Sequence, residues 1–232
     1  MMIGALGDIH GAFDTVQAIM MRHRDVPLWV SVGDVASNDG EYFEPAAPLY
    51  WVKGNNEDFD VVAAALGGNS ALASTLRYLP NGGPHVVGPW RVAALGGTFA
   101  PSWYNTPATA LPPSNVRTPS ASSLKLGKSR DDKRRHFVRD EVVACKALAN
   151  IDLFLTHEAP RPFYPAGLRI DAGKTVLNDV LAAMRPRLHL FGHHHEFTDS
   201  VRQGIRSIGL DVVTHSYLLI DAGTLKTERL DT

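Results

Sequence analysis

Short apolar runs, each of strand length, constrain the fold of this chain more than any other feature of its sequence. Helical patterns separate several of them, at residues 13–21 and 137–149, and Asp14 followed by Gln17 predicts a capping box at the first helix. Two further runs, 205–210 and 215–221, predict strands around a turn, with antiparallel pairing at the end of the chain. Alternating strands and helices predict a layered α/β domain. The first six runs are residues 3–6, 27–32, 49–52, 91–95, 151–155 and 188–191.

A potential metal ligand follows nearly every one of these runs. In layered α/β proteins the carboxyl ends of strands open onto a shared crevice, so residues far apart in sequence can meet there. A core does not tolerate so many unpaired polar groups, and metal ions are the simplest partners for them. The donors are Asp8 and His10 after the first run, Asp34 after the second, Asn55 after the third, His157 after the fifth, and His193 to His195 after the sixth.

The donor types narrow the choice of metal. Imidazole, carboxylate and amide oxygen without a thiolate suit Mn, Fe, Co, Ni or Zn, with Mn²⁺ as the first candidate. The donors exceed the needs of one ion, whereas two divalent metal ions about 3.5–4 Å apart, bridged by a carboxylate and a hydroxide, would use them all. Such a pair suits displacement at phosphorus, so we predict a metal-dependent phosphoesterase with a phosphate-ester substrate.

Each of these residues also has an ordinary structural interpretation. Asp8 and His10, within Gly-Asp-Ile-His-Gly, would fit a polar turn. Asp34 would fit a helix cap, and Asn55 is a common turn residue. His157 alone would fit a partly buried histidine with satisfied hydrogen bonds. It is their joint occurrence, in this order, that favours a metal site.

The run His193-His194-His195 is harder to explain as turn chemistry. Alternate residues at the end of a strand point the same way, so His193 and His195 are predicted to share one face. The run therefore supplies two imidazoles to the same site.

These motifs resemble the calcineurin-like metallophosphoesterase superfamily. Its motif order is Asp-x-His, Gly-Asp, Gly-Asn-His-Glu or Asp, His, then Gly-His-x-His. The matching segments here are Asp8-Ile9-His10, Gly33-Asp34, Gly54-Asn55-Asn56-Glu57, His157 and Gly192-His193-His194-His195.

The resemblance implies a four-layer αββα sandwich, with two mixed sheets face to face and helices outside, formed by residues 1–232 as a single domain. It also implies a division of the ligands between two ions, with Asp34 as the bridge and with His10, Asp34 and Asn56 closest to the chemistry. Asp8, His10 and His195 would bind one metal, and Asn55, His157 and His193 the other.

One position departs from the family pattern. Asn56 replaces the histidine that usually protonates the leaving oxygen or steadies the phosphate, and asparagine cannot deliver a proton at neutral pH. Loss of a general acid typically costs about 10²–10⁴ in rate, while the metal-dependent terms remain. Another group would then have to supply the proton or contact the substrate; His194, His136 and His85 are candidates that no spacing supports.

Residues 99–136 form a long loop excursion rich in proline, serine and threonine, and this region resembles one family within the superfamily. With Leu95-Gly96-Gly97-Thr98-Phe99 before it and residues 152–160 after it, the region is similar to the catalytic domain of RNA lariat debranching enzymes. This likeness and Asn56 favour phosphodiester or cyclic nucleotide substrates. A phosphomonoesterase, and a metal-binding regulatory protein without turnover, are the alternatives.

Composition constrains the partners and the compartment. The net charge of −1 gives no global attraction to nucleic acid or to an anionic membrane. Residues 125–140 hold seven Lys or Arg and three Asp, a local net of +4, which could contact a nucleotide backbone or simply be solvated. Cys145 is the only cysteine, so the chain has no disulfide framework, and the first six residues do not match a signal peptide. We therefore expect a cytoplasmic protein without membrane contact, of undetermined oligomeric state.

Overall fold

The computed structural model describes residues 1–69, 71–113, 131–167 and 169–232, and its described strands form two six-stranded sheets and one two-stranded sheet. The first sheet contains β1 (Met2–Leu6), β2 (Trp29–Ser31), β3 (Leu49–Trp51), β4 (Leu76–Tyr78), β13 (Ser216–Asp221) and β14 (Thr227–Asp231). The second contains β5 (Gly82–Val87), β6 (Trp90–Leu95), β9 (Leu153–Thr156), β10 (Leu188–Phe191), β11 (Thr198–Arg202) and β12 (Ile205–Gly209).

Both sheets have parallel central strands and antiparallel strands at an edge. The first has the order β14-β13-β1-β2-β3-β4, and the second β11-β12-β10-β9-β6-β5. Strands β1 to β4 pair in parallel, as do β6, β9, β10 and β12. The carboxyl ends of the parallel strands therefore lie together at one end of each sheet, where the loops that follow them begin.

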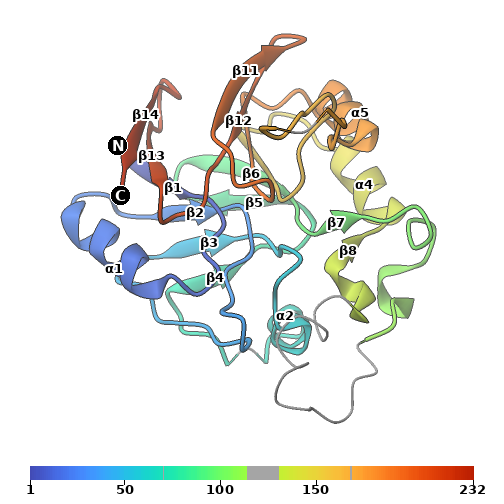
Figure 1. The fold of residues 1–232 in the computed structure, drawn as a ribbon, viewed down its shortest axis with the longest axis horizontal. Coiled ribbons are helices and arrows are strands. Elements are labelled where there is room, and N and C mark those ends of the chain that lie inside the picture. The colour runs from blue at the N-terminus through green and yellow to red at the C-terminus, as the bar shows by residue number, and fades with distance from the viewer. Residues whose placement is uncertain (70, 114–130, 168) are drawn as a thin grey trace.

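Side chains that alternate along the strands divide the protein into layers. Ile3 and Ala5 of β1 share one buried cluster with Leu153 and Leu155 of β9, so this cluster fills the space between the sheets. Phe154 points the other way, into a cluster with the helices of the second sheet. Figure 1 shows these helices on the side opposite α1. The helices are α1 (Phe13–Arg22) and α2 (Phe59–Leu66) against the first sheet, and α4 (Arg139–Lys146) and α5 (Thr175–Met184) against the second.

This arrangement confirms the predicted αββα sandwich, but the pairing at the end of the chain differs from the prediction. β12 and β13 do not pair with each other: β12 joins β10 in parallel, and β13 joins β1 antiparallel in the other sheet. The antiparallel partners are β11 and β14, which the sequence pattern did not reveal. Both are edge strands whose residues are mostly exposed, so they lack the apolar alternation that marks a buried strand.

The predicted capping box at α1 is wrong. The helix begins after Ala12, whose methyl side chain cannot accept a capping hydrogen bond. Gln17 instead donates to the carbonyl oxygen of Glu44 at 2.7 Å and accepts from the backbone N–H of Ala46 at 2.9 Å. The side chain that suggested a local cap is used to hold a distant loop.

The ends of the predicted excursion meet. β7 (Thr98–Phe99) pairs in parallel with β8 (His136–Phe137), and two short 3₁₀ helices, η1 (Ala108–Ala110) and η2 (Lys133–Arg135), lie between them. Residues 114–130, and with them part of the predicted basic segment, lie outside the described residues. In its described part, Arg134 pairs with Asp132 and Asp60. Among the helices that the structure describes, none is long and apolar enough to cross a membrane.

Candidate metal centre

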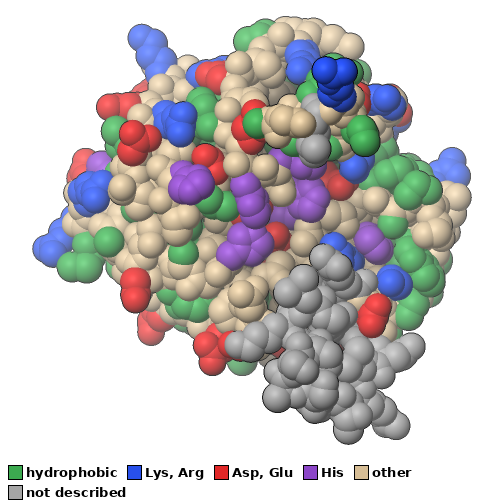
Figure 2. Space-filling model, viewed as in Figure 1, with side chains coloured by type: hydrophobic (Ala, Val, Ile, Leu, Met, Phe, Trp, Pro, Cys, Tyr) green, Lys and Arg blue, Asp and Glu red, His purple; other side chains and the backbone are tan. Residues whose placement is uncertain are grey.

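The predicted donors converge at the carboxyl ends of the two sheets. Asp8 and His10 follow β1, Asp34 follows β2 and Asn55 follows β3, all in the first sheet, whereas His157 follows β9 in the second. The segment after β10 brings the histidine run to the same place. Figure 2 shows histidine side chains gathered at the centre of one face, with acidic side chains between them.

One cluster contains Asp8, His10 and His195. His195 Nε2 lies 3.0 Å from Asp8 Oδ2 and 3.1 Å from His10 Nε2. His10 Nε2 lies 3.5 Å from Asp34 Oδ2. Ligands about 2.0–2.2 Å from one ion lie roughly 3.0–3.6 Å from each other, so these separations fit a shared cation.

A second cluster surrounds His157. Its Nε2 lies 3.1 Å from Asn55 Oδ1, 3.1 Å from His193 Nδ1 and 3.6 Å from Asp34 Oδ1. His157 Nδ1 lies 2.9 Å from the carbonyl oxygen of Val32 and must donate to it, which leaves the Nε2 lone pair facing the cluster. The geometry again fits one cation.

Asp34 belongs to both clusters. Oδ2 faces His10 of the first cluster and Oδ1 faces His157 of the second. Oδ1 also accepts a 2.7 Å hydrogen bond from the backbone N–H of Asn56, which holds the carboxylate between the clusters. Because the two oxygens point to different donor sets, Asp34 can bridge two ions.

Burial and the surrounding charges favour positive charge here. Burial raises the pKa of Asp8, but the hydrogen bond from His195 and the charge of His157 outweigh it and lower the pKa below its ordinary value. Burial lowers the pKa of His157, but the carboxylates of Asp34 and Asp8 raise it overall. Burial and the charge of His157 lower the pKa of His193 to about 2, so its ring stays neutral. The two buried carboxylates therefore favour positive charge beside them, either as a proton on His157 or as a bound cation.

The backbone conformation at the site differs from the prediction that His193 and His195 share one face of a strand. β10 ends at Phe191, and His193 and His195 have φ of 71° and 53°. His10 and Asp34 also have positive φ, at 48° and 50°. These left-handed turns, uncommon for residues with a Cβ, aim the side chains into the clusters and concentrate backbone strain at the site.

Two glycines allow the loops to approach the carboxylates. A Cβ on Gly54 would lie 2.0 Å from Asp34 Oδ1, and one on Gly192 would lie 2.4 Å from Asp8 Oδ1. Neither position has room for a side chain. The glycines of the Gly-Asn and Gly-His motifs are therefore required by contact with the predicted ligands.

Glu57 is a supporting residue whose role the sequence did not reveal. Its carboxylate accepts hydrogen bonds from the backbone N–H groups of Val35, Ala36 and Gly54 and from the hydroxyl of Tyr42. Burial and the nearby charge of Asp34 raise its pKa to about 8. Glu57 thus ties the loop after β2 to the loop after β3. Its place in the Gly-Asn-Asn-Glu motif was the available signal.

Asn56 and the other proposed substrate contacts occupy different surroundings. Asn56 Nδ2 lies 3.5 Å from His10 Nδ1, at the edge of the first cluster. The His194 ring stacks on Phe163, with centroids 4.7 Å apart, and His194 is a member of neither cluster.

The two remaining histidine candidates bond elsewhere. His136 Nδ1 bonds Thr98 Oγ1 at 2.9 Å where β7 meets β8, and His85 bonds the carbonyl oxygen of Pro80 at 2.8 Å. Neither contact is to a residue of the two clusters.

A sequence comparison identifies the family of this chain. The family model of the calcineurin-like phosphoesterase superfamily domain matches residues 1–231. The chain belongs to this superfamily. The family is metal-dependent, and Asp8, His10, Asp34 and His157 are candidate metal-binding residues. No curated protein is similar enough in sequence to match the chain.

Solved structures share the fold at low sequence identity. The protein TT1561 of Thermus thermophilus has a TM-score of 0.64 at 14% identity, covering 99% of this chain and 98% of that one. A dimetal phosphatase from Danio rerio has a TM-score of 0.51 at 11% identity, covering 100% and 98%. Another structure has a TM-score of 0.70 at 14% identity, covering 99% and 98%. At these identities the likeness establishes the fold alone.

Proposed function

We propose that this protein is a dinuclear metallophosphoesterase that hydrolyses phosphodiesters or cyclic nucleotides. The observation that carries the proposal is the pair of donor clusters that share Asp34. Asp8, His10 and His195 would hold one divalent ion, and Asn55, His157 and His193 the other, with Asp34 as the bridge. The donors are imidazole, carboxylate and amide oxygen without thiolate, which suit Mn, Fe, Co, Ni or Zn, and we take Mn²⁺ as the first candidate.

When bound, two such ions supply Lewis acidity toward a phosphoryl oxygen and lower the pKa of a bound water. The protein's own backbone groups orient the predicted metal ligands. Val32 holds the tautomer of His157, the backbone N–H of Asn56 holds Asp34, and the backbone N–H of His193 donates to both oxygens of Asp8. Fixed ligands of this kind need no reorganisation during the reaction.

The preference for diesters rests on Asn56. Without an imidazole at this position, the leaving oxygen receives no proton from that side chain. Esters whose leaving groups need little protonation are favoured. In the sequence alone, residues 95–160 resemble lariat debranching enzymes, which favours the same substrates. A nucleic-acid substrate would make binding weaken as salt rises.

Turnover by purified protein with Mn²⁺ tests the proposal. We expect hydrolysis of bis-p-nitrophenyl phosphate to exceed that of p-nitrophenyl phosphate, and Asp34→Asn to abolish both. His215→Asn, at an exposed side chain, is the matched control and retains activity. Faster hydrolysis of the monoester would assign a phosphomonoesterase. Metal binding without turnover of either ester would support a regulatory protein instead.

A further inference from the structure

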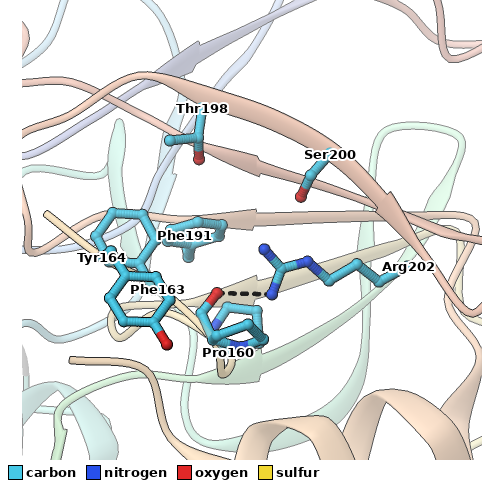
Figure 3. A pocket seen from close by; sticks show the side chains of 8 residues that line it. Pro160, Phe163, Tyr164, Phe191, Thr198, Ser200 and Arg202 are labelled. Carbon is cyan, nitrogen blue, oxygen red and sulfur yellow. Dashed lines mark hydrogen bonds between the residues drawn. The ribbon is translucent and has the colours of Figure 1, made fainter. Parts of the chain in front are cut away.

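An aromatic pocket lies beside the metal-ligand clusters, between the loop after β9 and the edge strand β11. Its volume is about 210 Å³. Cavities that hold a whole drug-sized ligand are roughly 300–1,000 Å³, so this one suits a single ring system. Figure 3 shows the aromatic rings on one side and polar side chains of β11 on the other. We define the aromatic pocket by Phe163, Tyr164, Phe191, Thr198, Ser200 and Arg202.

Packed rings connect the wall of the aromatic pocket to the metal-ligand clusters. Phe163 stacks on His194, and the His194 ring lies 4.8 Å from that of His193. Phe191 is the last residue of β10, two positions before His193, and its ring packs edge-on against Phe163 at 5.6 Å. Two ring contacts therefore separate the pocket wall from a predicted metal ligand.

The direction of β11 shows which end of the aromatic pocket lies nearer the metal-ligand clusters. Thr198 and Phe191 both pair with Gly209, which places Thr198 at the end of the sheet where the clusters lie. Alternate residues Thr198, Ser200 and Arg202 then line the pocket along one face of the strand, leading away from the clusters. A molecule with its phosphate at the clusters would extend its other end along this line.

The loop that carries the rings is held in place. Asp171 accepts hydrogen bonds from the backbone N–H groups of Phe163 and Gly173 and pairs with Arg161 at 2.7 Å. The backbone N–H of Ala166 donates to Glu196, which follows the histidine run, at 2.7 Å. The pocket wall is thus fixed against the same segment that carries His193 and His195.

The chemistry of the lining selects a planar, uncharged or electron-rich ring with polar edges. Tyr164 is 58% exposed and offers a ring face for stacking. Thr198 and Ser200 add hydroxyl groups, and Arg202 adds a guanidinium that already donates to the carbonyl oxygen of Pro162 at 2.6 Å. The described lining residues include no carboxylate and one guanidinium, so a cationic group would find no counter-charge there and would face the like charge of Arg202.

We propose that the aromatic pocket binds the nucleobase of a nucleotide ester whose phosphate lies at the metal-ligand clusters. This inference rests on the proposed phosphoesterase function and adds the class of substrate. Stacking of a base on an aromatic side chain typically contributes about 5- to 150-fold in affinity. Tyr164, as the most exposed ring, is the side chain expected to provide it.

Paired p-nitrophenyl esters that differ only in the base test the proposal. The substrates are the 5′-(p-nitrophenyl phosphates) of thymidine, of deoxyadenosine and of the abasic deoxyribose. For at least one base we expect kcat/KM to exceed the abasic value by about 5- to 150-fold in the wild type. Tyr164→Ala brings the ratio close to one, and Tyr164→Phe, which keeps the ring, preserves it. Ile170→Ala, a 76% exposed residue of the same loop, is the matched control and also preserves it.

Two results would overturn the inference while leaving the phosphoesterase proposal intact. One is a wild-type kcat/KM that is the same for the abasic ester and for both nucleoside esters. The other is a loss of kcat/KM in Tyr164→Ala that is equal for the nucleoside and the abasic esters. If the wild type hydrolyses no ester, the phosphoesterase proposal fails, and equilibrium dialysis with thymidine and deoxyadenosine 5′-monophosphates then decides about the pocket. Binding that Tyr164→Ala weakens would support it, and binding that is absent or unchanged would refute it.

Discussion

Single side chains at the site combine burial with specified hydrogen bonds. His157 is fully buried, and its Nδ1 bond to Val32 determines which nitrogen faces the second cluster. Asp8 and Asp34 are almost fully buried, which is costly for carboxylates unless a positive charge accompanies them. Asn56, in contrast, offers no titratable group beside His10. Replacing individual residues should therefore have distinct effects, which can be predicted one residue at a time.

Replacing Asn56 tests the missing general acid. In the wild type we expect hydrolysis rates to fall steeply as the pKa of the leaving group rises, because asparagine donates no proton. Asn56→His should flatten this dependence and raise the rate for poor leaving groups by roughly 10²-fold or more. Rates across a series of substituted phenyl esters measure the slope. Asn38→His, which adds an imidazole at an exposed loop residue, is the control, and a flat wild-type profile would refute the assignment.

Buried His189 is expected to make the free energy of unfolding depend on pH. It is fully buried in β10, where Thr156 Oγ1, which donates to the carbonyl oxygen of Glu158, must accept from His189 Nε2. Burial lowers the pKa of His189 to about 3, whereas an unfolded histidine has a pKa near 6.5. The unfolded state therefore binds more protons below pH 6.5. Stability present above that pH is lost as pH falls toward 3, by up to about 1.4 kcal/mol per pH unit.

Urea unfolding between pH 4 and pH 7 measures this contribution. His189→Phe, which keeps a ring between Phe154 and Phe191, should reduce the pH slope of the unfolding free energy. His215→Phe, at an exposed side chain, should keep the wild-type slope. Equal slopes in His189→Phe and the wild type would show that His189 does not cause the acid sensitivity.

At the scale of elements, the site is made by loops that begin where parallel strands end. β1, β2 and β3 deliver their loops from one sheet, and β9 and β10 from the other. Left-handed turns at His10, Asp34, His193 and His195 redirect the chain within these loops. Close contacts at Gly54 and Gly192 then leave no space for additional atoms.

Gly192→Ala tests this close packing. The new Cβ would lie 2.4 Å from Asp8 Oδ1 and 2.6 Å from Val32 Cγ2, so Asp8 or the loop that carries Gly192 must shift, which disturbs the 3.0 Å contact between Asp8 and His195. We expect the affinity for Mn²⁺ to fall on the order of 10- to 100-fold while the circular dichroism spectrum stays that of a folded protein. Calorimetric titration with Mn²⁺ measures the affinity. Gly67→Ala at the end of α2, where the nearest atom is 3.6 Å away, is the control; equal affinities would contradict the packing argument.

At the scale of the whole molecule, the two clusters join the two sheets. Asp34 and Asn55 come from the first sheet, and His157 and His193 from the second, above the apolar cluster that fills the space between the sheets. Any ion held by both groups links the layers at the carboxyl ends of the strands. Binding to the folded state alone would therefore stabilise the sandwich as a unit.

Metal addition and removal test this link. At a Mn²⁺ concentration 100 times Kd, we expect about 2.7 kcal/mol of added stability, reversed by a chelator. Thermal unfolding with and without Mn²⁺ gives the shift. His157→Ala removes a donor of the second cluster and should reduce it, whereas His85→Ala, in the edge strand β5, should not. A wild-type melting temperature that does not change when Mn²⁺ is added would argue against metal bound between the sheets.

The sequence by itself determined the layered α/β class, the central strands and the set of polar residues at their ends, because apolar period and strand length are local properties. A single-domain chain, a cytoplasmic location and the division of ligands between two ions stay predictions. Edge strands β11 and β14 escaped detection, since exposed strands carry little apolar signal.

Only the tertiary structure decided which sheet β12 and β13 join, that Gln17 holds a loop rather than a helix end, and that left-handed turns rather than strand alternation aim His193 and His195. It also decided the roles of Glu57 and the aromatic pocket. These features depend on contacts between residues distant in sequence. Such contacts exist only once the two sheets have packed together, so apart from the motif that contains Glu57 no local sequence pattern indicates them.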